Sequence, residues 1–273
     1  MLFKYIAGNK YYHAINKSQK ILSLNKIPVI NFSIENNKTN LSVYNEYKNI
    51  FNYLDHNYKI ALKLSSFNFD ESFINDIIDI YKTKDIKILI DAENNKFNNL
   101  YQDITNKLIE NHNSDKLNIY KTYQMYRKDS FIQLSNDIDI FKNYHLGVKL
   151  VRGAYWNSEK NDGHLFTKKY ETDFNYDNSI SLIYNHHYSN NINTILATHN
   201  KESINTGLHY NKKIRLDSKK FEYGHLMGMN ETVYNNINHN NKINVYIPYG
   251  PYHKMIPYLS RRLYENLDTI KYL

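Results

Sequence analysis

Two adjacent arginines near the end of the chain, Arg261 and Arg262, are followed closely by Glu265. Guanidinium groups are permanently charged and present paired donors in a rigid plane, which suits them to hold a carboxylate or a phosphate. On a helix, Glu265 lies three and four residues beyond the arginines, so its carboxylate can reach and orient either guanidinium. Most arginines, however, are solvated surface residues. The pair is either an anion-binding fork or an exposed helix surface, and the rest of the sequence must decide.

Polar residues also occupy the ends of several short apolar runs. They are Lys63, Ser65, Asp91, Glu93, Gln124, Lys149, Arg152, Thr198, His199, Asn200 and Tyr246. Each alone has an ordinary structural explanation, such as a helix cap for Asp91 or a buried, backbone-bonded ring for His199. If they converge, they form a cationic pocket with one strand-end carboxylate, amide groups and aromatic walls. Such a pocket suits an anionic substrate and an anionic, planar cofactor, because cations beside a flavin ring stabilise the charge that develops on reduction.

The sequence does not indicate a metal site. Neither His-x-His nor His-x-x-x-His occurs at the predicted strand ends, and the adjacent His186 and His187 fall in a helical stretch, where neighbouring side chains diverge by about 100°. The chain contains no cysteine, which excludes disulfides, thiolate ligands and cysteine nucleophiles. We therefore expect no metal.

Short apolar or β-branched runs alternate with stretches of helical period, the pattern typical of βα units around a parallel sheet. Strands are expected at 27–32, 60–65, 86–93, 117–124, 147–156, 193–200, 221–228 and 244–250. The helical spacing is clear in Phe73, Ile77, Ile78 and Tyr81, and again in Leu100, Ile104 and Leu108.

Eight βα repeats in roughly 250 residues are what a TIM barrel requires. A doubly wound sheet would use fewer strands and a Gly-rich first turn, and the sequence has no GxGxxG motif. We therefore predict a single α/β domain of the (βα)8 TIM-barrel class, with a pre-barrel segment over 1–26 and the barrel over 27–273. In such a barrel the functional residues lie at the C-terminal ends of the strands, where the polar residues above fall. Arg261 and Arg262 would then lie on the eighth helix.

The composition of the chain narrows the classes of partner that we expect it to bind. The net charge is +8, but no block of five or more Lys or Arg occurs, so nucleic acid is not expected. No run of 18 apolar residues occurs and the mean hydropathy is -0.68, which excludes a spanning helix but allows peripheral contact with a membrane. The first 34 residues lack acidic residues but also lack arginine, so a transit peptide is neither indicated nor excluded.

Several segments resemble the signature of the proline dehydrogenase family. They are KLVRGAYW (149–156), ATHN (197–200), HLMGM (225–229) and YIPYGPYHKMIPYLSRRLYEN (246–266), together with AGN (7–9), LKLS (62–65) and LIDAE (89–93). They occur in the family's order and spacing and cover nearly the whole predicted barrel. The resemblance implies FAD-dependent oxidation of L-proline to 1-pyrroline-5-carboxylate, the first step of proline catabolism, with electrons passed to a quinone.

The resemblance also implies individual roles. Asp91 and Lys149 fall on catalytic positions, where we expect electrostatic positioning, because hydride transfer demands alignment more than a strong base. Arg261 and Arg262 would hold the proline carboxylate with help from Lys63, while Glu265 orients the arginines. The walls of the substrate site would be Tyr155, Leu226 and Tyr246. The FAD contacts would be Ala92, Gln124, Val151, Arg152, Gly153, Ala154, Trp156, Thr198, His199 and Asn200.

One departure from the family pattern and two alternatives qualify this expectation. Many bacterial members have Arg and Lys where this chain has Lys149 and Arg152, the order of eukaryotic members, and Lys cannot make Arg's planar contact with a flavin. Tyr246 favours proline over hydroxyproline, because the hydroxyproline-using branch has a smaller residue there.

A hydroxyproline dehydrogenase is one alternative, and a non-catalytic barrel that binds a partner through its basic surface is the other. The family further implies a 1-pyrroline-5-carboxylate dehydrogenase as partner, and mitochondria as the compartment in a eukaryote, otherwise the cytoplasm or the periphery of the inner membrane.

Overall fold

The computed structural model describes residues 4–34, 39–186, 191–213, 221–229, 231–235, 237, 240–253, 255 and 260. Within these residues, eight parallel strands follow one another in chain order and close into a barrel, which confirms the predicted (βα)8 class. The chain divides into two compact units. Unit 1 comprises Met1–Ile86 and His225–Leu273, and unit 2 comprises Lys87–Gly224.

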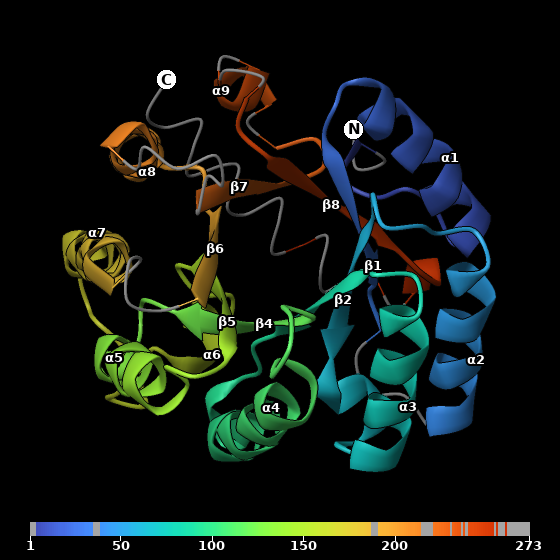
Figure 1. Ribbon diagram of the computed structural model, residues 1–273, viewed down its shortest axis with the longest axis horizontal. Coiled ribbons are helices and arrows are strands. Elements are labelled where there is room, and N and C mark those ends of the chain that lie inside the picture. The colour runs from blue at the N-terminus through green and yellow to red at the C-terminus, as the bar shows by residue number, and fades with distance from the viewer. Residues whose placement is uncertain are drawn as a thin grey trace. The chain divides into compact units, whose positions relative to one another are not determined.

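Unit 1 contains strands β1 (Ile27–Phe32), β2 (Lys59–Lys63) and β8 (Ile243–Tyr249), helices α1 (Tyr11–Ser23), α2 (Asn40–Phe51), α3 (Glu71–Lys82) and α9 (Glu231–Asn235), and the 3-10 helix η2 (Leu64–Phe67). Strand β1 pairs in parallel with both β2 and β8. Helices α1, α2 and α3 lie side by side in Figure 1. The first barrel strand therefore begins at Ile27, as predicted.

Helix α3 shows how the sequence builds this unit. It begins after Asp70, whose side chain accepts a hydrogen bond from the Ser72 amide and so caps the helix. One face of the helix is buried through Ile74, Ile77, Ile78 and Tyr81. The Tyr81 hydroxyl donates to the Tyr47 carbonyl on α2 at 2.8 Å. Burial of each such apolar side chain contributes about 1.5–3 kcal/mol, so this face fixes α3 against its neighbours.

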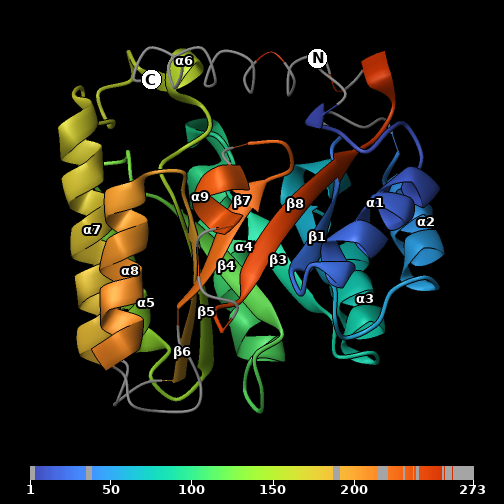
Figure 2. The same cartoon turned by 90° about the horizontal axis from the view of Figure 1, so that it is seen from above.

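Unit 2 contains strands β3 (Lys87–Asp91), β4 (Ile119–Gln124), β5 (His145–Val151) and β6 (Asn191–Ala197), helices α4 (Asn98–His112), α5 (Ser130–Ile140), α6 (Trp156–Glu159), α7 (Lys169–His186) and α8 (Lys201–Lys213), and the 3-10 helix η3 (Asn95–Phe97). Strand β7 (Phe221–Leu226) pairs with β6 up to Gly224. The order β3-β4-β5-β6 is parallel throughout. Figure 2 shows α7 and α8 running side by side.

A buried ion pair joins β4 to the helices of unit 2. Lys121 is fully buried, and its ammonium donates to Asp137 on α5 at 2.7 Å and to Asn106 on α4 at 2.6 Å. Burial lowers the pKa of Lys121, although Asp137 opposes that shift. These partners lie on the helices that cover the sheet, so the pair links layers of the fold.

Most strands end earlier than predicted. Strand β2 ends at Lys63, because the chain turns into η2 with the Ser66 hydroxyl donating to the Lys63 carbonyl at 2.6 Å. Strands β3, β5, β6 and β7 end at Asp91, Val151, Ala197 and Leu226. The predicted strands extended beyond these points into the polar residues that end each apolar run. The structure places them in the loops that follow, so the polar residues belong to the strand ends and the βα loops.

One helix buries a different set of residues from the set that its apolar spacing predicted. In α4, Ile104 and Leu108 are buried as expected, but Leu100 is exposed and Tyr101 takes the core position. The Tyr101 hydroxyl donates to the Thr122 carbonyl at 3.0 Å, which anchors that face of α4 to β4. Among the helices of the described segments, none combines the length and apolarity needed to cross a membrane.

Candidate active site

The ends of four adjacent strands in unit 2 bring most of the predicted site together. Because β3, β4, β5 and β6 are parallel neighbours, their carboxyl ends lie along one edge. The predicted residues on this edge and its loops are Asp91, Ala92, Gln124, Lys149, Val151, Arg152, Gly153, Ala154, Tyr155, Trp156, Thr198, His199 and Asn200. Both proposed catalytic residues and all proposed FAD contacts therefore lie in unit 2.

Lys149 and Asp91 form an ion pair across this edge. The Lys149 ammonium lies 2.5 Å from Asp91 Oδ1, and the two side chains are 6% and 16% exposed. The contact between the two side chains fixes the position of the ammonium. The structure thus brings the two proposed catalytic residues into contact, and the electrostatic role expected for them stays a prediction.

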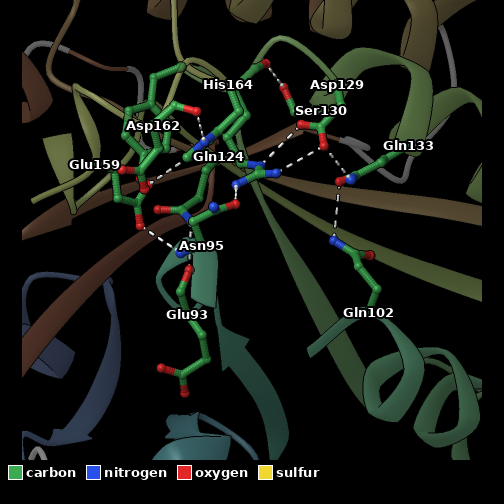
Figure 3. A network of polar contacts seen from close by, with 12 residues as sticks. Glu93, Asn95, Gln102, Gln124, Asp129, Ser130, Gln133, Glu159, Asp162 and His164 are labelled. Carbon is green, nitrogen blue, oxygen red and sulfur yellow. Dashed lines mark hydrogen bonds and ion pairs between the residues drawn. The ribbon is translucent and has the colours of Figure 1, made fainter. Parts of the chain in front are cut away.

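Gln124 connects two loops of the edge. This buried amide donates from Nε2 to the Glu93 carbonyl at 3.0 Å, and its Oε1 accepts from the Ala154 amide at 3.2 Å. Figure 3 shows Gln124 beside Glu93. The side chain therefore sets the spacing between the loop after β3 and the loop after β5. In the same region the Tyr155 hydroxyl donates to the Ala92 carbonyl at 3.4 Å.

Helices α7 and α8 hold the guanidinium of Arg152. Its Nε donates to Asp173 at 2.7 Å, one terminal nitrogen donates to the Thr198 hydroxyl, and the other donates to the Ser203 hydroxyl at 3.1 Å. The guanidinium also lies over the Tyr176 ring, 4.6 Å from its centroid. These contacts fix the plane of the cation.

The pKa values of two carboxyl groups near Arg152 are shifted in opposite directions. Burial opposes ionisation of Asp173, but hydrogen bonds from Lys169 and Arg152 outweigh it and lower the pKa of that carboxyl. Burial raises the pKa of Asp177, against a hydrogen bond donated by Ser203 at 2.6 Å. Of the two, Asp173 is the one held in its charged form beside the guanidinium.

The residues after β6 combine structural and candidate binding roles. Asn200 caps α8, because its Oδ1 accepts from the amides of Glu202 at 2.8 Å and Ser203 at 3.2 Å. The buried Thr198 hydroxyl accepts from the Asn200 amide at 3.1 Å. His199 is half-buried, and its proposed contact with FAD stays a prediction.

A buried network that the sequence did not reveal lies under the loop after β5. Glu159, on α6, is almost fully buried and accepts from the Asn95 amide at 2.7 Å and from the Tyr126 hydroxyl at 2.8 Å. Arg127 continues the network by binding Asp129 and the side chain of Asn95. Figure 3 shows this network. The sequence could not identify these residues, because Glu159 follows the residues WNS, two of which are polar, and this pattern predicts a surface position.

The remaining predicted residues belong to unit 1 or fall outside the described residues. Lys63 ends β2, and Leu226 ends β7, both half-buried. Tyr246 is a buried residue of β8, and its carbonyl accepts from the Met227 amide at 2.9 Å, which places it beside the end of β7. Arg261, Arg262 and Glu265 lie outside the described residues. In the part of the chain that the structure describes, no cluster of three His, Cys, Asp or Glu side chains could hold a metal ion.

The closed barrel, with paired charges and amide groups at its strand ends, defines the chain as a (βα)8-barrel protein. The chain belongs to the proline dehydrogenase family, because the family model described as "Proline dehydrogenase" matches residues 8–271.

Curated relatives agree with this membership, and a solved structure shares the fold. The chain is 28% identical to "Proline dehydrogenase 1, mitochondrial" of Drosophila melanogaster, over 72% of this chain and 32% of the relative. It is 30% identical to a "Hydroxyproline dehydrogenase" of Xenopus laevis, over 68% of this chain and 43% of the relative. The structure of proline utilization A from Bdellovibrio bacteriovorus superposes with a TM-score of 0.86 at 19% identity, over 97% of this chain and 32% of that chain. The chain thus spans less than half the length of these proteins.

Proposed function

We propose that the chain catalyses the FAD-dependent oxidation of L-proline to 1-pyrroline-5-carboxylate and passes the electrons to a quinone, the first step of proline catabolism. The observation that carries this proposal is the edge of unit 2, which holds both the Lys149–Asp91 pair and Arg152 bound to Asp173. The chain that carries this edge belongs to the proline dehydrogenase family. Bound FAD would take up the hydride removed from proline.

The residues of the edge fit a flavin cofactor. Gly153 has a φ of +146°, and a Cβ built there would lie 2.3 Å from the Tyr126 ring, so the backbone follows a path open only to glycine. Close backbone approach of this kind suits contact with a large planar ligand. Lys149 and Arg152 supply positive charge for an anionic cofactor, and both are held by carboxylates that fix their positions.

We assign substrate binding to the residues that the family resemblance implies. Arg261 and Arg262 would bind the proline carboxylate, with Lys63 assisting and Glu265 orienting the arginines, while Tyr155, Leu226 and Tyr246 would enclose the ring. Support for the arginines comes from the sequence segment 246–266. Support for Leu226 and Tyr246 is that Leu226 ends β7 and that the next residue, Met227, donates its amide to the Tyr246 carbonyl in the middle of β8. These residues would bind and orient proline, while Asp91 and Lys149 set the electrostatics of the reaction.

Anaerobic titration of the purified protein tests the proposal. We expect visible flavin absorbance and its bleaching on addition of L-proline, with recovery when a soluble quinone is added. Protein that binds no FAD would overturn the proposal. Bleaching that is faster with hydroxyproline would favour the alternative suggested by the Xenopus laevis relative. FAD binding without bleaching by either amino acid would favour a non-catalytic barrel that binds a partner through its basic surface.

We further propose that the protein touches a membrane peripherally, where a quinone is available, and supplies its product to a 1-pyrroline-5-carboxylate dehydrogenase. Support for membrane contact is a group of exposed apolar side chains on α5 and α7, namely Ile132, Tyr170 and Phe174, which line one groove. The names of eukaryotic relatives support a mitochondrial location if the source is a eukaryote. In a bacterium the same surface would face the cytoplasmic side of the inner membrane.

A further inference from the structure

The loop after β5 leaves the strand and returns to one residue, Tyr126. The Tyr126 amide donates to the Arg152 carbonyl at 2.7 Å, and its carbonyl accepts from the Phe166 amide at 2.9 Å. A bridge between Arg127 and Leu165 lies alongside. Tyr126 therefore joins both ends of the 152–166 loop, which carries Gly153, Ala154, Tyr155 and Trp156.

The Tyr126 ring sets the backbone path at the start of this loop. The ring lies so close to Gly153 that a built Cβ would come within 2.3 Å of its Cδ1 atom. The next amide, that of Ala154, is then directed to Gln124 Oε1 at 3.2 Å. A shift of the ring would move the two residues that we assign to the flavin contact.

The hydroxyl of the same side chain is held by Glu159. It donates to Glu159 Oε2 at 2.8 Å, while Glu159 Oε1 accepts from the Asn95 amide at 2.7 Å. Figure 3 shows the Glu159 carboxylate with Asn95 and His164 close by. Burial, reinforced by the charge of Glu159, raises the pKa of Tyr126, so the hydroxyl stays protonated and acts as a donor. Glu159 thus ties α6, the loop after β3 and the Tyr126 ring together.

We propose that Tyr126 and Glu159 are positioning residues for the cofactor: the buried carboxylate fixes the tyrosine ring, and the ring fixes the Gly153–Ala154 backbone against which the flavin binds. This inference rests on the proposed function. Neither residue has to touch the flavin, so their effect is on the affinity and environment of the flavin, and proline binding is affected only through it.

Four variants test the inference through the dissociation constant of FAD and the visible circular dichroism of the bound flavin. Glu159→Ala removes the acceptor of two buried donors, and Tyr126→Phe removes one hydrogen bond but keeps the ring. Glu159→Gln keeps one carbonyl acceptor and offers an amide to the tyrosine oxygen, so it should restore most of the effect. Tyr101→Phe is the matched control, because Tyr101 is another buried tyrosine of unit 2, and its hydroxyl bonds to the backbone of Ile90 on β3 and Thr122 on β4.

We expect the FAD dissociation constant to rise at least tenfold in Glu159→Ala, about fivefold in Tyr126→Phe and less than threefold in Glu159→Gln, with an altered flavin dichroism in the first two. Tyr101→Phe should lower the melting temperature of the apoprotein without changing either flavin signal. If Glu159→Ala and Tyr126→Phe change only the melting temperature, or if Tyr101→Phe weakens FAD binding as much as Tyr126→Phe does, the inference is wrong. Wild-type protein without FAD affinity would instead overturn the proposed function itself.

Discussion

The side chain of Asn200 has a structural role that can be separated from its proposed contact with FAD. Its oxygen caps α8, and the amide nitrogen takes no part in those two bonds. We expect Asn200→Asp to keep the cap, because a carboxylate accepts the same bonds and favours a helix N-terminus, while FAD affinity falls at least threefold through loss of the donor. Titration of the apoprotein with FAD and thermal melting measure the two effects. Asn200→Ala should also lose about 1 kcal/mol of stability. Unchanged FAD affinity in Asn200→Asp would leave Asn200 as a helix cap alone.

The Lys149–Asp91 pair should contribute to stability as well as to catalysis. Asp91→Ala leaves a buried ammonium without its carboxylate, and breaking a buried ion pair in this way costs about 3 kcal/mol. Urea unfolding of the apoprotein gives this free energy. Lys82 and Asp79 provide a comparison on the surface, so Asp79→Ala should cost less than about 0.5 kcal/mol. Equal effects of the two alanine substitutions would show that the Lys149–Asp91 pair is no more coupled than a surface pair.

At the scale of elements, the loop after β5 contains two glycines that differ in a useful way. Gly153 and Gly163 both have a positive φ, but a Cβ at Gly153 collides with the Tyr126 ring, and a Cβ at Gly163 meets nothing within 4 Å. We expect Gly163→Ala to cost about 1 kcal/mol through backbone strain alone. Gly153→Ala should cost clearly more and weaken FAD binding at least tenfold. Melting temperatures and FAD titrations of both variants check this, and equal effects on FAD would contradict the importance of the collision.

Strand β7 carries a histidine that makes stability depend on pH. His225 is buried against the Tyr234 ring, with centroids 4.3 Å apart, and burial lowers its pKa from 6.5 to about 4. The folded protein therefore binds fewer protons than the unfolded chain between pH 4 and 6.5. The contribution of neutral His225 to the free energy of unfolding is fully present above about pH 6.5 and is lost as the pH falls towards 4. It amounts to roughly 3 kcal/mol.

Urea unfolding between pH 4.5 and 7 tests this dependence. His225→Phe keeps an aromatic ring against Tyr234 but cannot titrate, so its stability should fall less over this range than that of the wild type. The exposed His56 provides the control, and His56→Gln should keep the wild-type slope. Parallel pH profiles for His225→Phe and the wild type would refute the assignment.

At the scale of the whole molecule, the net charge of +8 and the apolar group on α5 and α7 support binding to anionic membranes. We expect the protein to sediment with anionic vesicles, less so at high salt, because both apolar burial and charge attraction contribute. The double substitution of Ile132 and Phe174 by Ser should weaken this binding at least tenfold. Leu41→Ser, which removes an exposed leucine of α2, should leave it unchanged. Equal vesicle binding by the double variant and the wild type would exclude this surface.

The barrel was predictable because its signal is periodic. Alternating βα runs fixed the number and order of the strands, and the polar residues at the strand ends located the edge of unit 2. The positions of Tyr126 and Glu159 could not be predicted, because they depend on the path of a returning loop rather than on a repeat. Apolar spacing alone also could not distinguish Leu100 from its neighbour Tyr101, which is the buried residue and bonds to the backbone of Thr122.

The pairing of β1 with β8 has a consequence for the order of events during protein synthesis. Strand β1 lies beside β8 along its whole length, from Ile27 opposite Asn244 to Phe32 opposite Tyr249. During translation β1 therefore leaves the ribosome long before β8 has been synthesised. The edge of β1 that pairs with β8 stays unpaired until then. By the time β8 emerges, residues 87–224 have already been made. A nascent chain that has reached residue 224 thus holds every residue proposed here to contact FAD, before the two arginines proposed for the substrate have been translated.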